Sequence, residues 1–452
     1  MAGSEFRYVT TNLYQPVRTV TNAVGNGTSI TYTSSNTFEV GQYVTTTGIL
    51  PSQYNKTNVA ITAATSTTFT IASGSTGTFT QAGTATAPNR IISELPFTGV
   101  NFSSQLNSVG TFQGHVLLSG LNATTANVFD GTLPAKTILW VLYTNPITFT
   151  TNPVWSGVIW AREYDSASQT LSISAQEMMS VYNRRRISTT KTYSTFTDPA
   201  VIARQLLQYT EGLSHGNTGL TYNTTTTVYS TKNVYEGYQL KSVYSAIKDL
   251  AARFFDFKIQ PYWNPTYGFL YNIFIIGVGS NYTASDSPIF QFPGNVIEYK
   301  FPEDGSGTVN KLYGLGYGDN TTKFEAIAYD PTLIGSSTSQ PLTATWPLLE
   351  DSTSYTDIPD NTLVTDLTKG QLNAISYPPT TVEIVIAPYV DPYYSIDFFV
   401  GDEARVNIKD DFFPGGLDTI LRIVAVTVNP GEAGPSRVTL TLTRQLADGA
   451  VS

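Results

Sequence analysis

Two histidines, His115 and His215, are the residues of this chain best suited to acid–base chemistry near neutral pH. His115 lies in a run typical of a strand, and His215 lies in a loop rich in Gly, Ser and Asn. A Ser-His-Asp relay also needs an exposed serine, and no strand-turn-helix elbow of the Gly-x-Ser-x-Gly kind accompanies either histidine. The pattern therefore favours structural histidines, buried or on the surface.

The absence of cysteine limits the metal chemistry that the chain can perform. It excludes thiolate zinc sites, cysteine nucleophiles and disulfides together. Calcium could still use acidic loops, but the sequence contains no EF-hand spacing. We therefore expect no catalytic residue, no metal site and no cofactor, and hence a protein that is not an enzyme.

Paired carboxylates are the remaining candidates for acid–base catalysis. A glycosidase needs two carboxyl groups that face each other across a cleft, and closeness in sequence does not provide that arrangement. Such pairs usually lie in exposed turns, which is the interpretation that we favour. The pairs are Glu163 with Asp165, Glu350 with Asp351, and Asp410 with Asp411.

The series Gly314-x-Gly316-x-Gly318 matches a phosphate-binding loop in its glycine spacing. It lies within an aromatic strand pattern, however, and no helix pattern follows it, whereas a phosphate site uses the N-terminus of a helix. Glycine beside aromatic residues in a strand more often marks a bulge or close packing. We therefore predict strand packing here.

Asn183-Arg184-Arg185-Arg186 is the only dense basic run. Three adjacent arginines could contact nucleic acid, pair with acidic neighbours or mark an interface, and we favour a subunit contact. Exposed tryptophans could stack on sugars, although such residues more often fill cores. The candidates are Trp155, Trp160, Trp263 and Trp346.

The elements that position these residues are predicted to be mainly strands. Only 13% of the 452 residues are charged, whereas 28 are Tyr and 23 are Phe, a composition typical of β proteins. The length allows for roughly three domains. The net charge of −9 argues against a free-standing nucleic-acid binder, because phosphate contacts need clustered Lys and Arg.

Residues 17–89 differ from the rest in being nearly free of charge and rich in Thr, Ser, Gly and Ala. Apolar residues alternate with Thr through Thr67–Ile71 and Phe38–Val44, and glycine turns separate such runs. A low-complexity linker would not need this alternation. We therefore predict a small β-sandwich module.

The segment 90–187 again shows short β-rich runs, and helical patterns appear only after it. Asp198-Pro199 can cap and open a helix through Leu207, Leu240–Phe255 has one apolar face, and a third helix is expected from Thr362 to Ile375. Strand alternation returns from Thr380 onwards. The order predicts a mainly β chain with an α+β middle.

The N-terminal residues have neither the basic segment nor the apolar stretch of a signal peptide, so we expect no export by that route. The longest apolar run, Phe269–Val278, is too short to cross a bilayer and indicates a buried strand.

A set of short motifs occurs along most of the chain: Phe6–Val9, Ile92–Val100, Gln105–Asn107, Gly110–Phe112, Trp155–Ile159, Asn183–Arg185, Pro293–Val296, Val400–Glu403 and Arg422-Ile423. In the order of these motifs, the chain resembles the hub-type minor tail proteins of long-tailed phages, particularly those that infect Actinobacteria. Each motif is short, and the resemblance depends on their shared order. Residues 17–89 depart from the family and look like an accessory β module.

The resemblance implies a homotrimeric hub at the tail tip with two β-barrel domains per subunit, which adapts a sixfold tail tube to a threefold tip and forms part of the DNA-ejection conduit. The implied partners are the distal tail or tail tube protein, the tape measure protein and fibre or tip proteins; phage DNA would pass without specific binding, and the insert could contact a host-surface glycan. The implied location is the virion tail tip, after assembly in the host cytoplasm. The implied domains are 1–16 with 90–187 as an N-terminal barrel, 17–89 as an inserted immunoglobulin-like module, 188–300 as an α+β domain, 301–378 as a connecting β-rich and helical domain, and 379–452 as a C-terminal barrel.

Two other functions remain open. The Thr- and Gly-rich insert and the many aromatic residues are compatible with a receptor- or glycan-binding tail fibre or spike, although the chain shows no sustained repeat. A cell-wall hydrolase at the tail tip is the second alternative, and the residue types give no support for it.

Overall fold

The computed structural model describes residues 5–443 except 120, 122–126, 279–286, 319–322, 335–345, 356–357, 359, 377–380 and 432–435. The outer ends of the expected first and last domains, residues 1–4 and 444–452, therefore lie outside the described residues. Among the helices that can be described, none is long and apolar enough to cross a membrane.

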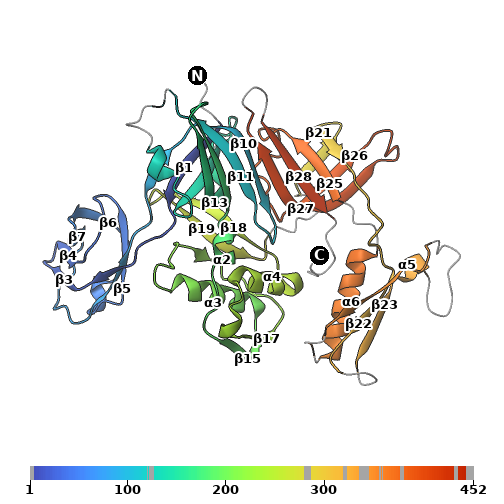
Figure 1. Ribbon diagram of the computed structural model, residues 1–452, viewed down its shortest axis with the longest axis horizontal. Coiled ribbons are helices and arrows are strands. Elements are labelled where there is room, and N and C mark those ends of the chain that lie inside the picture. The colour runs from blue at the N-terminus through green and yellow to red at the C-terminus, as the bar shows by residue number, and fades with distance from the viewer. Residues whose placement is uncertain are drawn as a thin grey trace.

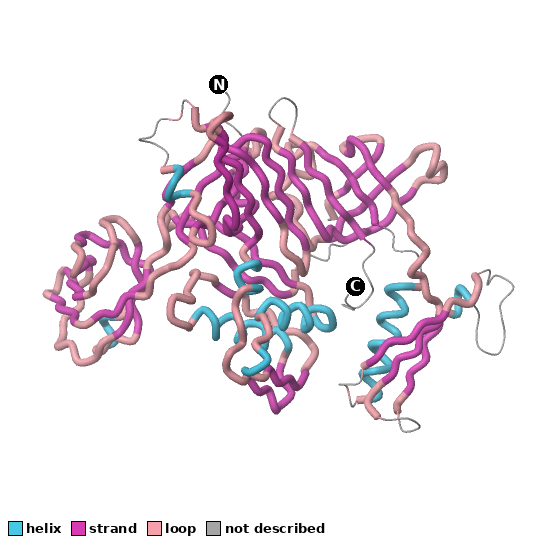
Figure 2. The backbone as a smooth tube through the Cα atoms, in the orientation of Figure 1, coloured by secondary structure: helices cyan, strands magenta, loops and turns pink. Residues whose placement is uncertain are grey.

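Two β regions lie side by side and carry three further lobes (Figure 1). The insert, residues 17–89, forms a lobe at one end of the molecule. A helical lobe lies beneath the N-terminal β region, and a smaller lobe with one long helix lies beneath the C-terminal β region. Figure 2 shows that strands dominate the two β regions, whereas the helices are concentrated in the two lower lobes.

Seven antiparallel strands form the N-terminal β region, in the order β9-β1-β12-β13-β14-β11-β10. Strand β9 leads directly into β10 through Leu95-Pro96, so the two ends of this sheet segment are consecutive in the chain and nearly close a barrel. The short helix α1 (Val128–Gly131) precedes β12. The strands are β1 (Phe6–Asn12), β9 (Ile91–Glu94), β10 (Phe97–Gln105), β11 (Thr111–Leu117), β12 (Thr137–Thr144), β13 (Thr151–Asp165) and β14 (Thr170–Glu177).

The C-terminal β region repeats this plan with six strands in the order β20-β26-β27-β28-β25-β21. Here β20 runs parallel to β26, and a turn at Pro293–Asn295 leads from β20 into β21. Strands β20 and β21 lie within residues 188–300, but they pair with β26 and β25 of the C-terminal segment, respectively. The strands are β20 (Ile289–Phe292), β21 (Val296–Lys300), β25 (Thr381–Ile386), β26 (Glu403–Ile408), β27 (Leu417–Asn429) and β28 (Arg437–Thr443).

A single strand pair joins the two β regions into one 13-stranded sheet. The second half of β27 pairs with the end of β10, from Phe102 opposite Val428 to Gln105 opposite Ala425. One hydrophobic core continues across this pair, and it includes Phe112 and Trp155 on one side and Ile384 and Leu440 on the other. The two barrels therefore form one unit within the chain.

The insert has a hydrophobic core of its own. Its strands follow the order β2-β8-β5-β6-β7-β4-β3, and β6 takes part in both halves of the resulting sandwich. Tyr32 stacks on Phe69 at a ring distance of 4.8 Å, and its hydroxyl donates to the carbonyl of Tyr54. The elements are β2 (Arg18–Val20), β3 (Asn22–Gly25), β4 (Ser29–Thr33), β5 (Tyr43–Thr47), the 3-10 turn Ser52–Tyr54, β6 (Lys56–Ala64), β7 (Thr68–Ala72) and β8 (Gly83–Thr86).

Helices pack on a small sheet in the helical lobe. The carboxylate of Asp198 accepts from the amide of Ala200 and caps α3, as predicted. The next helix begins only at Val243, because Leu240 has a left-handed backbone (φ 47°) and Ser242 provides the cap. The elements are α2 (Met179–Asn183), β15 (Lys191–Thr197), α3 (Pro199–Glu211), β16 (Thr221–Tyr222), β17 (Thr231–Tyr235), the 3-10 turn Gly237–Gln239, α4 (Val243–Phe254), β18 (Phe257–Asn264) and β19 (Phe269–Ile276).

The lower lobe on the C-terminal side is a three-stranded sheet with helix α6 on one face. The carboxylate of Asp360 accepts from two amides at the start of α6, which confirms the third predicted helix. The predicted fold, mainly β with an α+β middle, two barrel regions and an inserted sandwich, is confirmed. The elements of this lobe are β22 (Lys311–Leu315), β23 (Glu325–Tyr329), α5 (Pro331–Ile334), β24 (Glu350–Ser354) and α6 (Asn361–Ile375).

Candidate functional site

The two histidines lie on separate elements. The imidazole of His115, on β11, lies against the backbone of Gly99 and leaves no room for a side chain there. His215 has its Nδ1 3.0 Å from the hydroxyl of its neighbour Ser214, and its ring packs against Tyr14. Residues 212–216 have the Gly-x-Ser-x-Gly spacing but follow the end of α3, so they do not form a strand-turn-helix elbow. Within the described residues no group of His, Asp and Glu could hold a metal ion.

The acidic pairs serve local structure. Hydrogen bonds in the turn between β13 and β14 lower the pKa of Asp165. Hydrogen bonds likewise lower the pKa values of Glu350 and Asp410, mainly through a lysine and a tyrosine, respectively. The principal partners of the three carboxylates are Ser168, Lys311 and Tyr299.

The glycine series permits close packing of α6 on β22. A Cβ atom at Gly314 would lie 1.8 Å from the hydroxyl oxygen of Thr368, and one at Gly316 would lie 3.3 Å from side-chain atoms of Phe324 and Val364. Among the described residues between β22 and β23, none is helical. The prediction of close packing is confirmed at these two positions.

Two of the four candidate tryptophans are part of the packed interior. Trp155 is fully buried, and its indole N–H donates to the carbonyl of Ser103. Trp160 donates to the hydroxyl of Ser180 and is covered by the guanidinium of Arg184, 4.1 Å from the ring centre. Trp263 and Trp346, in contrast, remain 41% and 36% exposed.

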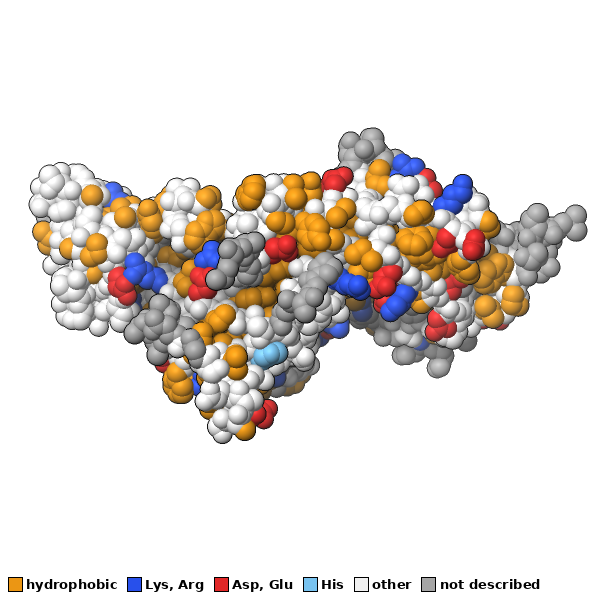
Figure 3. Space-filling view, turned by 90° about the horizontal axis from the view of Figure 1, so that it is seen from above, with side chains coloured by type: hydrophobic (Ala, Val, Ile, Leu, Met, Phe, Trp, Pro, Cys, Tyr) orange, Lys and Arg blue, Asp and Glu red, His pale blue; other side chains and the backbone are white. Residues whose placement is uncertain are grey.

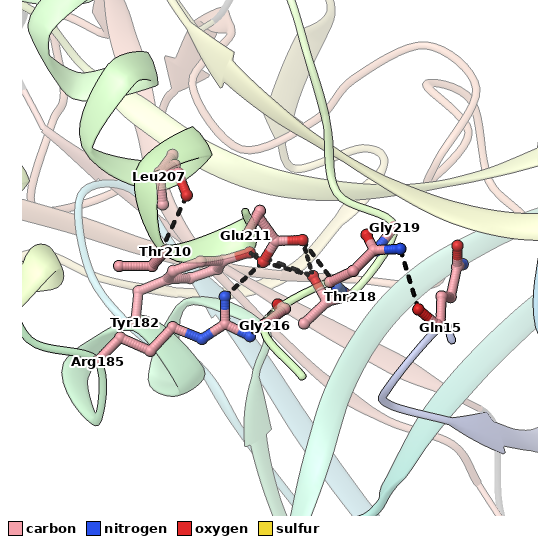
Figure 4. Close-up of polar contacts among 10 residues, drawn as sticks. Gln15, Tyr182, Arg185, Leu207, Thr210, Glu211, Gly216, Thr218 and Gly219 are labelled. Carbon is pink, nitrogen blue, oxygen red and sulfur yellow. Dashed lines mark hydrogen bonds and ion pairs between the residues drawn. The ribbon is translucent and has the colours of Figure 1, made fainter. Parts of the chain in front are cut away.

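Arg185 of the basic run is engaged within the chain, which corrects the expectation of a subunit contact at this residue. Its guanidinium forms an ion pair with Glu211 at 2.6 Å, and both side chains are mostly buried. The hydroxyl of Tyr182 and the amide of Thr218 donate to the same carboxylate (Figure 4). Burial, and then the negative charge of Glu211, raise the pKa of Tyr182 well above its usual value. The adjoining loop is also tied to the insert's linker, because Gln15 accepts from the side chain of Asn217 and donates to its carbonyl.

A second charged junction connects three parts of the chain. Two of its residues, Asn107 and Arg422, lie in motifs of the family resemblance, but the sequence does not predict that they meet at Asp256. Arg422 on β27 forms an ion pair with Asp256, which precedes β18. The guanidinium also donates to the carbonyls of Gly401 and Val278. Asn107, in the turn after β10, donates to Asp256. This network, Asn107–Asp256–Arg422, locks the helical lobe to both β regions.

Beside this network lie a carboxylate and an amine whose protonation is altered by burial. Burial raises the pKa of Glu177 to about 7, although the hydroxyl of Ser104 and an amide donate to the carboxylate. Burial also lowers the pKa of Lys258 to about 8, and its amine donates to the carbonyl of Val400. The negative charges of Asp402 and then Glu177 favour the charged lysine, and the lysine in turn favours the charged glutamate.

Each lower lobe exposes apolar side chains on a face that its own core does not use. On the helical lobe, Phe196 and Val234 lie on the outer face of the β15–β17 ribbon and are 70% and 53% exposed. We call this the ribbon face; Tyr238, 81% exposed, follows it in the chain. On the other lobe, α6 covers one face of the sheet, and Ile327 and Tyr329 lie on the opposite face, which we call the open sheet face. These exposed apolar side chains are our candidates for interaction surfaces.

No family model matches the chain, and no curated protein matches it. Among solved structures, a tail protein from Neisseria meningitidis MC58 is similar with a TM-score of 0.51 and 12% sequence identity, over 80% of this chain and 95% of that one. The 43 kDa tail protein of prophage MuSo2 from Shewanella oneidensis gives a TM-score of 0.49 at 12% identity, over 79% and 95% of the two chains. A prophage tail protein from Listeria monocytogenes gives 0.47 at 13% identity, over 80% and 92%. At this identity the Neisseria comparison concerns the fold, and the chain shares the fold of that tail protein.

Proposed function

We propose that this protein is a non-enzymatic structural component of a phage tail, and that it forms a homotrimeric hub at the tail tip. The observation that carries the proposal is the pair of barrel regions joined through β10 and β27 in a fold shared with a tail protein. Two barrels per chain give six barrels in a trimer. A threefold tip of this kind can dock on a sixfold tail tube.

The ribbon face and the open sheet face support a ring. They belong to different lobes of one chain, so a contact between them joins unlike surfaces of neighbouring copies. Such head-to-tail contacts produce a closed ring when the rotation between copies closes. A pair of like faces would produce a twofold dimer instead.

The low charge content suits a conduit for DNA. The net charge is −9, and Arg184 and Arg185 of the one basic run are engaged by Trp160 and Glu211 within the chain. Clustered cations would bind phosphates and slow the passage of DNA. We place the protein in the virion of a long-tailed phage, assembled in the host cytoplasm, with the distal tail or tube protein, the tape measure protein and fibre or tip proteins as its partners.

Electron-microscope class averages of the purified full chain test this proposal. We expect threefold rings with a central opening. A solid elongated trimer would instead favour a fibre. A protein that remains monomeric even when mixed with its tail tube protein would contradict the hub.

A further inference from the structure

A cleft of about 350 Å³ lies where the insert meets the tip of the β18–β19 hairpin. One wall comes from the insert and its return linker, through Gly41–Tyr43 and Pro88–Ile91. The other wall is the hairpin tip, with Trp263 and residues Tyr267–Leu270. Its volume falls at the lower end of the range for small-ligand pockets, about 300–1,000 Å³. The cleft exists only because the insert and the body lie together.

Aromatic rings form the hairpin side of the cleft. Tyr267 meets Tyr43 of the insert edge to face at 4.8 Å, and its ring is parallel to that of Phe269. Trp263 lies opposite Leu270 in the hairpin register, yet its side chain is not packed in a core and stays 41% exposed. The cleft therefore presents an indole ring to solvent beside fixed aromatic neighbours.

Polar groups held in place by the chain lie on the opposite wall. The side-chain nitrogen of Asn89 donates to the carbonyls of Asn12 and Tyr14. The side-chain oxygen of Asn89 takes no part in these bonds and can accept a hydrogen bond. Arg90 is held by an ion pair with Glu39 and has further N–H groups to donate. Asn89 and Arg90 line this wall, so the cleft combines an apolar platform with groups that can accept and donate hydrogen bonds.

The charge balance selects the class of ligand. Among the described residues that line the cleft, Arg90 is the one cation, and it already forms an ion pair with Glu39, so a phosphate or carboxylate gains little there. Charged side chains are also sparse on the surface of the insert that Figure 3 shows. A saccharide ring offers C–H groups for the indole face and hydroxyls that both donate and accept. We propose that this cleft binds a neutral saccharide, with a sugar ring against Trp263 and hydroxyls bonded to Asn89 and Arg90.

This inference goes beyond the hub role and does not depend on ring formation. The full chain is screened on an array of neutral and anionic oligosaccharides, and calorimetry then measures the Kd of the strongest neutral ligand for three proteins. These are the native protein, Trp263→Ala, and Trp346→Ala as a control that removes a similarly exposed tryptophan on a lobe far from the insert. We expect Trp263→Ala to weaken binding about tenfold or more and Trp346→Ala to change it less than twofold.

Two outcomes would overturn the proposal: no neutral saccharide bound at millimolar concentration, or equal affinities of the native protein and Trp263→Ala for the neutral ligand. Because both substituted side chains are exposed, folding is checked by the same melting temperature in all three proteins. Class averages of the same samples separate the two proposals. Rings without saccharide binding would refute only the cleft. Saccharide binding by a protein that stays monomeric even when mixed with its tail tube protein would refute only the hub.

Discussion

Removal of the Arg422 side chain tests whether the charged junction holds the C-terminal β region against the helical lobe. The side chains of Arg422 and Asp256 are only 18% and 20% exposed, so water screens their attraction weakly. Loss of one partner of a buried ion pair costs about 3–5 kcal/mol, because the other charge is left without its counterion. Partial exposure places Arg422→Ala near the lower end, at about 3 kcal/mol. Part of this loss comes from the hydrogen bonds to Gly401 and Val278.

Native-state hydrogen exchange, followed by mass spectrometry, measures this loss locally without requiring the whole chain to unfold in one step. A loss of about 3 kcal/mol makes exchange roughly 100-fold faster in peptides from β26 and the start of β18, since each 1.4 kcal/mol is about tenfold. Arg405→Ala is the matched control. Arg405 pairs with Asp418 in the same β region, but these side chains are 36% and 48% exposed. We expect at most about 1 kcal/mol there, or about fivefold. Equal effects of the two substitutions would refute the argument that burial gives the junction its strength.

Three further predictions concern packing, pH and assembly. Gly314→Ala should destabilise the α6 lobe by about 1–3 kcal/mol, because its Cβ would overlap the hydroxyl of Thr368. Gly307→Ala, just before β22 in the same lobe, meets open space and is the control; exchange in α6 and β22 measures the difference. Burial raises the pKa of Glu177 to about 7, so the folded protein binds a proton at this carboxylate more tightly than the unfolded chain does. The resulting stabilisation of the folded state is complete below the ordinary pKa of about 4.5 and is lost as the pH rises through about 7. Glu177→Gln should flatten this decline in melting curves between pH 5 and 7.5, and an unchanged slope would exclude this residue as its source. Ile327→Asp, on the open sheet face, should prevent ring formation in class averages while leaving the melting temperature within about 2 °C, since the side chain is 52% exposed.

Local elements were predictable where a short-range signal specifies them. Asp198 and Asp360 cap α3 and α6 from adjacent positions, and both helices follow with one apolar face. The insert was recognisable for a similar reason, because its strands alternate locally and its core is its own. The start of α4 was misplaced because Leu240 continues the apolar spacing while its backbone is left-handed.

The junctions were not predictable, because alternation identifies a strand but not its partner. Asn101 and Asn429 lie 328 positions apart and are hydrogen-bonded across the β10–β27 pair. Glu177 is the last residue of β14 and Lys258 is the second residue of β18, and only the fold brings them close to each other. Trp155 is buried and Trp263 is exposed, but the residues next to each tryptophan in the sequence do not indicate this difference.

The position of the insert explains how one chain can carry a mechanical hub and a binding cleft. Residues 17–89 lie between β1 and β9, and these strands are hydrogen-bonded neighbours, with Thr10 opposite Ser93 and Thr11 opposite Ile91. The two ends of the insert therefore leave the barrel at adjacent points. Because a folded module with adjacent ends can span this gap, the insertion adds little to the entropy cost of pairing β1 with β9. The same geometry brings the return linker past the β18–β19 hairpin, which creates the cleft against Trp263. The cleft thus lies where the insert meets the body, and it shares no lining residue with the strand pair that joins the two barrels. Changes at Trp263 and changes at the junction between β10 and β27 should therefore act independently, as expected for distant sites without shared partners.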